Sequence, residues 1–152
     1  MQKEMAKRKS MQDDPCPVGR SLDIVGDRWS LLIVRDAFDG TRRFSDFQRS
    51  LGVARNILAD RLRNLVEEDI LTIQPASDGT SYHEYVLTTK GDRLFPVVVA
   101  LRQWGEHYLF RQDELHSQLL DKATGKNVGQ MALRDANGEV LNADQTIVKK
   151  IR

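Results

Sequence analysis

Apolar residues recur every three or four positions in the first part of the chain, which is the spacing of an amphipathic helix. The positions that carry this pattern are Leu22, Val25, Trp29, Leu32 and Ile33. Gly26 interrupts the pattern, so it predicts two helices, at about 17–25 and 28–38, with Asp39-Gly40 ending the second.

A pair of shorter helices is predicted next. Arg42-Arg43-Phe44 is short enough to form one β-bridge, and Ser45 then resembles the N-cap of a brief helix that carries Phe47 and Leu51 on its inner face. Gly52-Val53 makes a tight connection to a helix over about 54–68, whose core positions are Leu58, Leu62, Leu65 and Val66. Two short helices joined around a glycine form the helix-turn-helix pattern.

The periodicity then changes to that of strands. Leu71-Thr72-Ile73 and Tyr85-Val86-Leu87 predict a β-hairpin, with Asp78-Gly79 in the segment between them. A helix restarts at Thr88 or Thr89 and continues to about Arg111, with Pro96 expected to bend it or to delay its regular start. This order of elements is that of a winged helix-turn-helix domain.

The last predicted helix carries a second apolar pattern. Its spacings of 3, 4, 3 and 4 form a two-heptad seam of the kind that joins helices, at Leu94, Val97, Leu101, Trp104 and Tyr108. Beyond it, Asn137-Gly138 lies between two short apolar segments and predicts a further hairpin, to which 146–151 could add a strand.

The sequence therefore predicts an α+β fold that is mainly α, with a C-terminal β-rich extension. We divide it into a flexible basic arm (1–14), a winged helix-turn-helix DNA-binding and dimerisation domain (15–111) and the extension (112–152), which we expect to form a β-hairpin.

Composition narrows the class of protein. The chain has 152 residues, of which 40% are hydrophobic and 30% charged, and it has no run of 18 apolar residues that could cross a membrane. No apolar segment follows the basic residues near the N-terminus, so we expect a cytoplasmic protein. The single cysteine, Cys16, excludes a disulfide framework and a cysteine-rich zinc site.

Positive charge is concentrated in one segment, although the whole chain has a net charge of only +1. Residues 41–64, here called the arginine strip, contain six arginines and two aspartates, a net charge of +4. An anionic polymer would explain such a strip, and a plain solvated surface is the alternative.

The residue types on the second helix of the pair suit the reading of DNA bases. Arginine pairs with guanine and asparagine with adenine, and phosphate contacts are expected just before such a helix. We therefore expect base contacts from Arg55, Asn56 and Arg63, and phosphate contacts from Arg42, Arg43 and Arg49. Arg61 lies beside the core positions, and we expect it to pair with a carboxylate inside the domain.

Several motifs in this order resemble the HxlR-type winged helix-turn-helix regulators of bacteria. The resemblance covers about 16–108 and rests on Cys16-Pro17-Val18, Val25-Gly26-Asp27-Arg28-Trp29, Leu31-Leu32-Ile33, Gly40-Thr41-Arg42-Arg43-Phe44, Leu58-Ala59-Asp60-Arg61-Leu62, Glu84-Tyr85-Val86-Leu87-Thr88, Lys90-Gly91, Pro96 and Leu101-Arg102-Gln103-Trp104-Gly105. It implies a homodimeric transcription factor that binds double-stranded DNA, with the N-terminal and the long C-terminal helix in the dimer interface.

The predicted wing departs from this family. Its members usually carry a basic residue near the wing tip, whereas 78–83 contain neither arginine nor lysine. Wing contact with DNA would then depend on Tyr82 or a protonated His83.

Three further questions stay open at this point. Cys16 is either a redox-sensing thiol or a small, partly buried hydrophobic residue, and we favour the second because Asp13 and Asp14 oppose thiolate formation. A small-molecule effector could bind between helices beside aromatic residues, although helical spacing favours core positions for these. The basic arm could enter a minor groove, although a solvated tail is favoured.

Enzyme functions are disfavoured. The three histidines have no metal-ligand spacing, and no glycine-rich phosphate loop follows a strand, so we expect neither a metal nor a cofactor. The alternative to DNA binding is a winged helix that contacts an acidic protein partner through its basic strip.

Overall fold

The computed structural model describes residues 10–151. The chain forms two compact units, and the boundary between them along the sequence falls between Phe95 and Pro96. The predicted basic arm lies for the most part outside the described residues. The predicted domain boundary at 111–112 stays a prediction. No helix within the described residues is long and apolar enough to cross a membrane.

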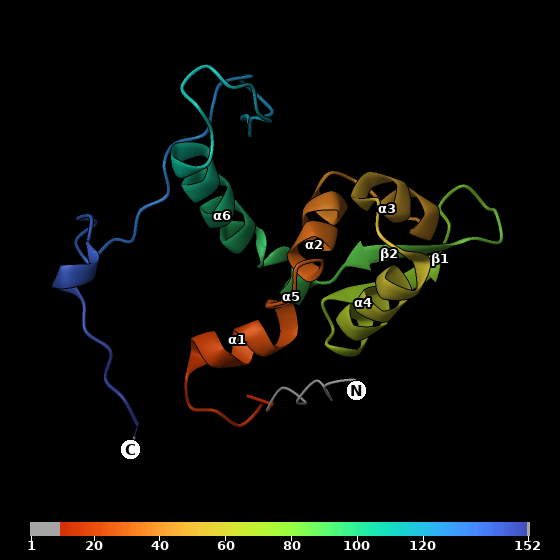
Figure 1. Ribbon diagram of the computed structural model, residues 1–152, viewed down its shortest axis with the longest axis horizontal. Coiled ribbons are helices and arrows are strands. Elements are labelled where there is room, and N and C mark those ends of the chain that lie inside the picture. Colours follow the sequence, from red (N-terminus) through yellow and green to blue (C-terminus); the bar gives the residue numbers. More distant parts are fainter. Residues whose placement is uncertain (1–9, 152) are drawn as a thin grey trace, which may run out of the picture. The chain divides into compact units, whose positions relative to one another are not determined.

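The first unit contains five helices and a two-stranded sheet, which can be followed in Figure 1. Their order is α1 (Pro17–Val25), α2 (Ser30–Phe38), α3 (Phe44–Leu51), α4 (Arg55–Glu67), β1 (Leu71–Pro75), β2 (His83–Leu87) and α5 (Thr89–Asp92). The strands are antiparallel and pair Leu71 with Leu87 and Pro75 with His83. The mainly helical winged helix-turn-helix fold is thus confirmed.

The core of this unit forms where α2, α3 and α4 meet. Its fully buried side chains come from all three helices and from the start of β1: Ile33, Val34, Phe47, Leu58, Leu62, Leu65 and Leu71. The leucines of α4 are spaced so that they share one face, which leaves the opposite face of the helix to solvent.

Two details before α4 differ from the prediction. The N-cap of α3 is Arg43 and not Ser45, because the helix begins two residues earlier than predicted, at Phe44. The bridge predicted at 42–44 is reduced to one hydrogen bond, from the Tyr85 amide to the Arg42 carbonyl (2.7 Å). This bond still ties the segment before α3 to the edge of β2.

The predicted helix 88–111 is divided in two. Thr88 caps α5 by accepting a hydrogen bond from the Gly91 amide (3.0 Å), and the chain leaves the helical path before α6 (Phe95–Tyr108) begins. Pro96 is the second residue of α6, a position where its missing amide hydrogen costs nothing. The delayed start predicted from Pro96 is confirmed, whereas the continuous helix was wrong.

The second unit comprises α6 and the extension, which is less regular than predicted. Within the extension there are two isolated bridges, Leu120–Asn127 and Arg134–Val140, and one 3-10 turn, η1 (Ala143–Gln145). The Asn137-Gly138 turn does form, closed by the Asp135 carboxylate, but it is flanked by a single bridge and no strand forms at 146–151. The β-rich extension and its hairpin were therefore overpredicted.

Candidate nucleic-acid interface

The helix-turn-helix is formed by α3, α4 and the tight connection between them. Gly52 ends α3 with a left-handed backbone (φ 61°), and nothing lies within 4 Å of the position a side chain would take. The glycine is needed there because L side chains rarely adopt this conformation, and not because space is short. The turn lets α4 cross α3 and present its N-terminal end.

Arg55 and Asn56 lie on the exposed N-terminal turn of α4. The Arg55 guanidinium lies over the ring of Phe44, with Cζ 5.0 Å from the ring centroid. Among residues 10–151, no carboxylate pairs with Arg55. It is thus the one arginine of the strip whose charge stays uncompensated within the described chain.

The other arginines predicted to contact DNA all have carboxylate partners. Arg42 lies 3.3 Å from the buried Glu84, and Arg49 lies 3.4 Å from Asp46 within α3. Arg63 pairs with Asp60 and, at 3.8 Å, with Glu67, both on its own helix. These side chains remain partly exposed, so they can exchange a carboxylate for a phosphate or a base edge.

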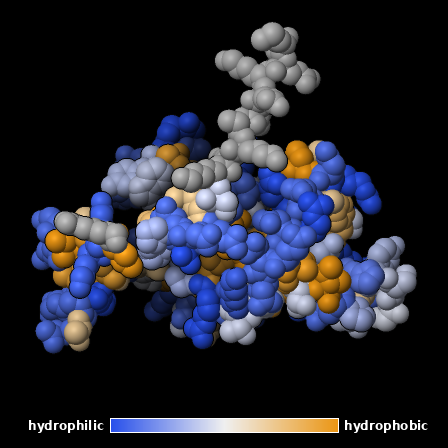
Figure 2. Space-filling view, turned by 90° about the horizontal axis from the view of Figure 1, so that it is seen from below, coloured by the Kyte–Doolittle hydropathy of each residue, from blue (hydrophilic) through white to orange (hydrophobic). Residues whose placement is uncertain are grey.

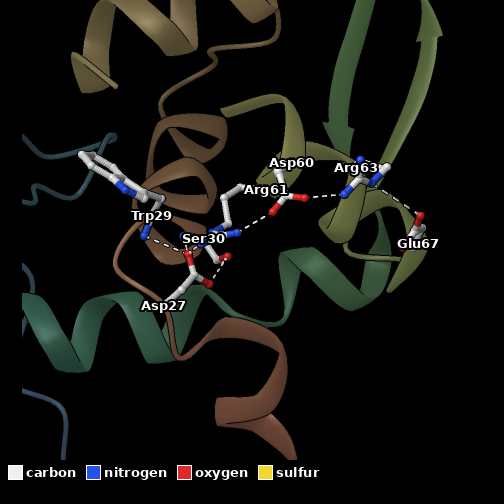
Figure 3. Close-up of polar contacts among 7 residues, drawn as sticks. All are labelled: Asp27, Trp29, Ser30, Asp60, Arg61, Arg63 and Glu67. Carbon is white, nitrogen blue, oxygen red and sulfur yellow. Dashed lines mark hydrogen bonds and ion pairs between the residues drawn. The ribbon is translucent and has the colours of Figure 1, made fainter. Parts of the chain in front are cut away.

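Asp27 connects α4 to the start of α2 (Figure 3). Its carboxylate accepts hydrogen bonds from the amides of Trp29 and Ser30 (both 3.0 Å), from the Ser30 hydroxyl (2.5 Å) and from Arg61 Nε (2.9 Å). Arg61 also bonds Asp60 (2.5 Å), the residue that pairs with Arg63. The prediction that Arg61 pairs inside the domain is confirmed.

The ionised form of Asp27 is favoured by this arrangement. Burial raises the pKa of its carboxyl, but the hydrogen bonds from Ser30 and Trp29 and the charge of Arg61 together outweigh burial, so the pKa lies below its usual value. A charged Asp27 therefore both caps α2 and anchors α4.

An arginine from outside the wing, the hairpin of β1 and β2, contacts the tip of the wing. Arg43, at the start of α3, forms an ion pair with Asp78 at the wing tip, and its guanidinium lies 5.0 Å from the ring centroid of Tyr82. Hydrogen bonds from Thr80, together with Arg43, lower the pKa of Asp78 to about 2. The predicted wing residues Tyr82 and His83 are both exposed.

Glu84 is a structural residue that sequence analysis missed. It is buried in β2, where its carboxylate accepts hydrogen bonds from the Ser77 amide (3.1 Å) and hydroxyl (3.0 Å) and pairs with Arg42. The hydrogen bonds from Ser77 are the first cause of its lowered pKa, assisted by Arg42 and opposed by burial. The sequence analysis named Glu84 only as part of the Glu84-Tyr85-Val86-Leu87-Thr88 motif, and that motif gave no indication that its carboxylate is buried.

The residues expected in a dimer interface lie on α6 and α1, outside the helix-turn-helix. In α6, Val97, Leu101, Trp104 and Tyr108 are exposed and Leu94, just before it, is half-buried. In α1, Val18 and Leu22 are also exposed. Figure 2 shows hydrophobic atoms reaching the surface in several patches among hydrophilic ones. Such apolar surface is available to a partner.

Cys16 is exposed, so our interpretation of it as a partly buried residue was wrong. It is the N-cap of α1, and its sulfur accepts a hydrogen bond from the Gly19 amide (3.5 Å). In the described part of the chain, no cluster of three or more histidine, cysteine or acidic side chains could hold a metal ion.

Comparisons with known proteins agree with this geometry. A family model of HxlR-like helix-turn-helix domains matches residues 24–113. An uncharacterised HTH-type transcriptional regulator of Mycobacterium tuberculosis, Rv3095, is 41% identical over 126 residues, which cover 83% of this chain and 80% of the relative.

Solved structures extend the likeness. The crystal structure of PA1607, a proposed transcription factor, is similar with a TM-score of 0.89 and 50% identity, covering 94% of this chain and all of the other. The redox regulator HypR in its oxidised form is similar with a TM-score of 0.55 and 31% identity, covering 60% of this chain and 96% of the other. The similarity to PA1607 thus covers nearly the whole chain, whereas the similarity to HypR covers three fifths of it.

Proposed function

Because the chain belongs to the HxlR-like helix-turn-helix family and is a transcriptional regulator of the HTH type, we propose that it binds a specific DNA operator as a homodimer. In this proposal α4 enters the major groove and its N-terminal turn contacts the base edges. The observation that carries the proposal is the open end of α4, where Arg55 and Asn56 are exposed and Arg55 has no carboxylate partner within residues 10–151.

The roles of the other residues follow from their positions around α4. Arg42 and Arg43 directly precede α3 and Arg49 lies in its last turn, so they suit phosphate contacts, for which their ion pairs must open. Arg63 lies two turns further along α4, where a base contact requires it to leave Asp60 and Glu67. Arg55 and Asn56 are therefore the stronger candidates for base contact.

The homodimer is proposed from the exposed apolar seam of α6. Trp104 and Tyr108 are 58% and 65% exposed, and large aromatic side chains of this kind are typical of interface cores. A twofold dimer would place two copies of α4 on half-sites one helical turn, or a multiple of it, apart on a palindrome-like operator. We place such a regulator in the cytoplasm, where bacterial DNA lies.

Fluorescence anisotropy tests the proposal directly. The wild-type protein would be titrated with a duplex from upstream of its own gene and with a scrambled duplex, between about 50 and 200 mM salt. We expect a large preference for the first duplex and a steep fall of affinity with salt. Arg55→Ala should cost about 1–3 kcal/mol of specific binding and relax the sequence preference.

Arg111→Ala is the matched control, because Arg111 is an exposed arginine beyond α6. Equal losses on both duplexes would make Arg55 a phosphate contact. If the wild-type protein binds neither duplex even at low salt, the DNA-binding proposal fails and the basic strip is better explained by an acidic protein partner.

Cys16 supports a second function, the sensing of oxidants. The thiol is exposed at the N-terminal end of α1, and a relative of this fold is a redox regulator. A lone cysteine would need Cys16 of a second copy, or a small thiol, to form a disulfide. Repeating the DNA titration with oxidised protein should change the affinity of the wild type and leave Cys16→Ser unchanged; an equal effect on both would exclude Cys16 as the sensor.

A further inference from the structure

The extension is held against α6 through polar side chains. Arg102 Nη1 donates hydrogen bonds to the Ser117 carbonyl (3.0 Å) and hydroxyl (2.9 Å). Gln103 donates to the Gly129 carbonyl (3.0 Å) and accepts from the Met131 amide (2.7 Å). The extension therefore returns to α6 at two points, and the chain between them lines a space beside the helix.

A cavity of about 270 Å³ lies between α6 and this part of the extension. Most of the side chains around it are polar, including Arg102, Glu106, His116, Gln118, Asn127 and Gln130. A segment that docked only for stability would fill this space with apolar groups, whereas Leu115 next to it is 95% exposed. The composition of the walls is therefore that of a site for a polar ligand.

The volume limits the size of the ligand. A water molecule occupies about 30 Å³ in the liquid, so a cavity of this volume holds several water molecules and has room for a small organic molecule. That is the scale of a small metabolite.

Two opposite charges stand side by side in the wall. Arg102 and Glu106 are one helical turn apart, and the distance from Arg102 Nη1 to Glu106 Oε1 is 3.9 Å, too long for a hydrogen bond. Their side chains are 23% and 32% exposed, so each can accept a further partner. Arg102 suits a carboxylate, and Glu106 suits an ammonium group.

His116 adds an acceptor to the same wall. Its Nδ1 lies 2.8 Å from the Ser117 carbonyl oxygen, and since a carbonyl can only accept, Nδ1 carries the hydrogen. In the neutral ring Nε2 is then an acceptor. The amides of Gln118, Asn127 and Gln130 offer both donors and acceptors.

We propose that this cavity binds a zwitterionic amino acid with a short polar side chain. Its carboxylate pairs with Arg102, its ammonium group pairs with Glu106, and its side chain bonds the amides of the extension. Binding requires no DNA; only the role of the ligand as an effector rests on the proposed function.

Isothermal titration of the full-length protein with L-asparagine, an amino acid with a short polar side chain, tests the proposal. We expect saturable binding of one molecule per chain. Glu106→Gln should weaken it at least tenfold, because the side chain keeps its size and loses its charge. Glu114→Gln, the same change outside the cavity walls, should bind like the wild type.

Variation of the ligand gives a second test that requires no altered protein. N-acetyl-L-asparagine lacks the ammonium group, and asparaginol lacks the carboxylate; each should bind at least tenfold more weakly than asparagine. The proposal is overturned if asparagine gives no saturable heat at about 10 mM, or if Glu106→Gln or acetylation leaves its affinity unchanged. Since no DNA is present, either result leaves the DNA-binding proposal to its own test.

Discussion

Asp27 fixes two helices with a single carboxylate. It accepts hydrogen bonds from the amides of Trp29, the N-cap of α2, and of Ser30, its first residue, which no helical carbonyl can reach. It also holds Arg61 in the middle of α4. Hydrogen bonds to a charged group are stronger than those between neutral groups. The Asp27–Arg61 pair is also partly shielded from water. One residue thereby adds a charged contact to the apolar packing between α2 and α4.

Replacing Asp27 should weaken the fold in a way that depends on pH. The pKa of Asp27 is lower in the folded chain than its ordinary value of 3.8, so its charge stabilises the fold above about pH 4 and this contribution is lost as pH falls through the folded pKa. We expect Asp27→Asn to lower the free energy of unfolding by about 1–3 kcal/mol at pH 7 and by less at pH 3.

Urea unfolding followed by circular dichroism at both pH values measures this difference. Asp39→Asn, at an exposed aspartate just after α2, serves as the control and should stay close to the wild type. A loss that is the same at pH 3 and pH 7 would show that the shape of Asp27, and not its charge, is what matters.

The sequence predicted only half of this contact. Arg61 could be assigned to an internal ion pair because it lies beside Leu58, Leu62 and Leu65 on the periodic pattern of α4. Its partner, Asp27, lies 34 positions earlier in the chain. The two residues meet only because α2 and α4 pack together, and the sequence pattern does not encode that contact. Periodicity predicts on which face of a helix a residue lies, but it does not predict which residue of another element contacts that face.

At the scale of elements, the wing and the start of α3 form one polar surface. The hairpin itself was predicted from its alternation and from Asp78-Gly79. The approach of Arg43 to Asp78 was not, because the two residues are 35 positions apart and neither belongs to a periodic pattern. The wing that lacks its own arginine or lysine thereby gains a guanidinium, which Asp78 partly neutralises.

Removing that carboxylate should release Arg43 for DNA. Because the pKa of Asp78 is about 2, the ion pair persists at any pH near neutrality. We expect Asp78→Asn to tighten DNA binding at low salt and to steepen the dependence of log affinity on log salt by about one unit, the change typical of one added phosphate contact.

A double-mutant cycle with Arg43→Ala identifies the cause of the effect. In the Arg43→Ala background, Asp78→Asn should leave the salt dependence nearly unchanged. The same steepening in both backgrounds would mean that Asp78 repels DNA directly and that the wing does not rely on Arg43.

At the scale of the whole molecule, α6 offers two chemically different faces. The seam predicted from heptad spacing carries exposed apolar residues, while Arg102, Gln103 and Glu106 face the extension. The spacing was sufficient to predict which apolar residues share one side of α6, since heptad position is local information; their role in a dimer stays a prediction. The contacts of the extension depend on backbone groups that carry no sequence signal.

The extension also shows why a turn signal does not guarantee a hairpin. Asn137-Gly138 specifies the reversal of the chain, and the reversal is present. Strands need several cross-strand pairs with a shared apolar face, and an isolated two-stranded hairpin is only marginally stable. The segments beside this turn form one bridge and leave Leu133 exposed.

Charged residues in the seam should produce monomers. We expect Leu101→Glu combined with Trp104→Glu to halve the mass found by light scattering at a concentration where the wild type is dimeric, because carboxylates cannot be buried there unpaired. Leu115→Glu makes the same kind of change at an exposed leucine of the extension and should remain dimeric. An unchanged mass in the double variant would rule out the seam.

The ion pairs of the arginine strip have a consequence for the search of a genome. A guanidinium already held by a carboxylate gains little from moving to a phosphate, so under the proposed function sites with random sequence would retain the protein only briefly. In the proposed complex, the ion pairs at Arg42, Arg43, Arg49 and Arg63 would open at the operator, where Arg55, which has no carboxylate partner among residues 10–151, contacts a base edge. If the chain binds DNA as proposed, the carboxylates would reduce the time spent on wrong sites and would thereby set how quickly a few molecules can survey a whole chromosome.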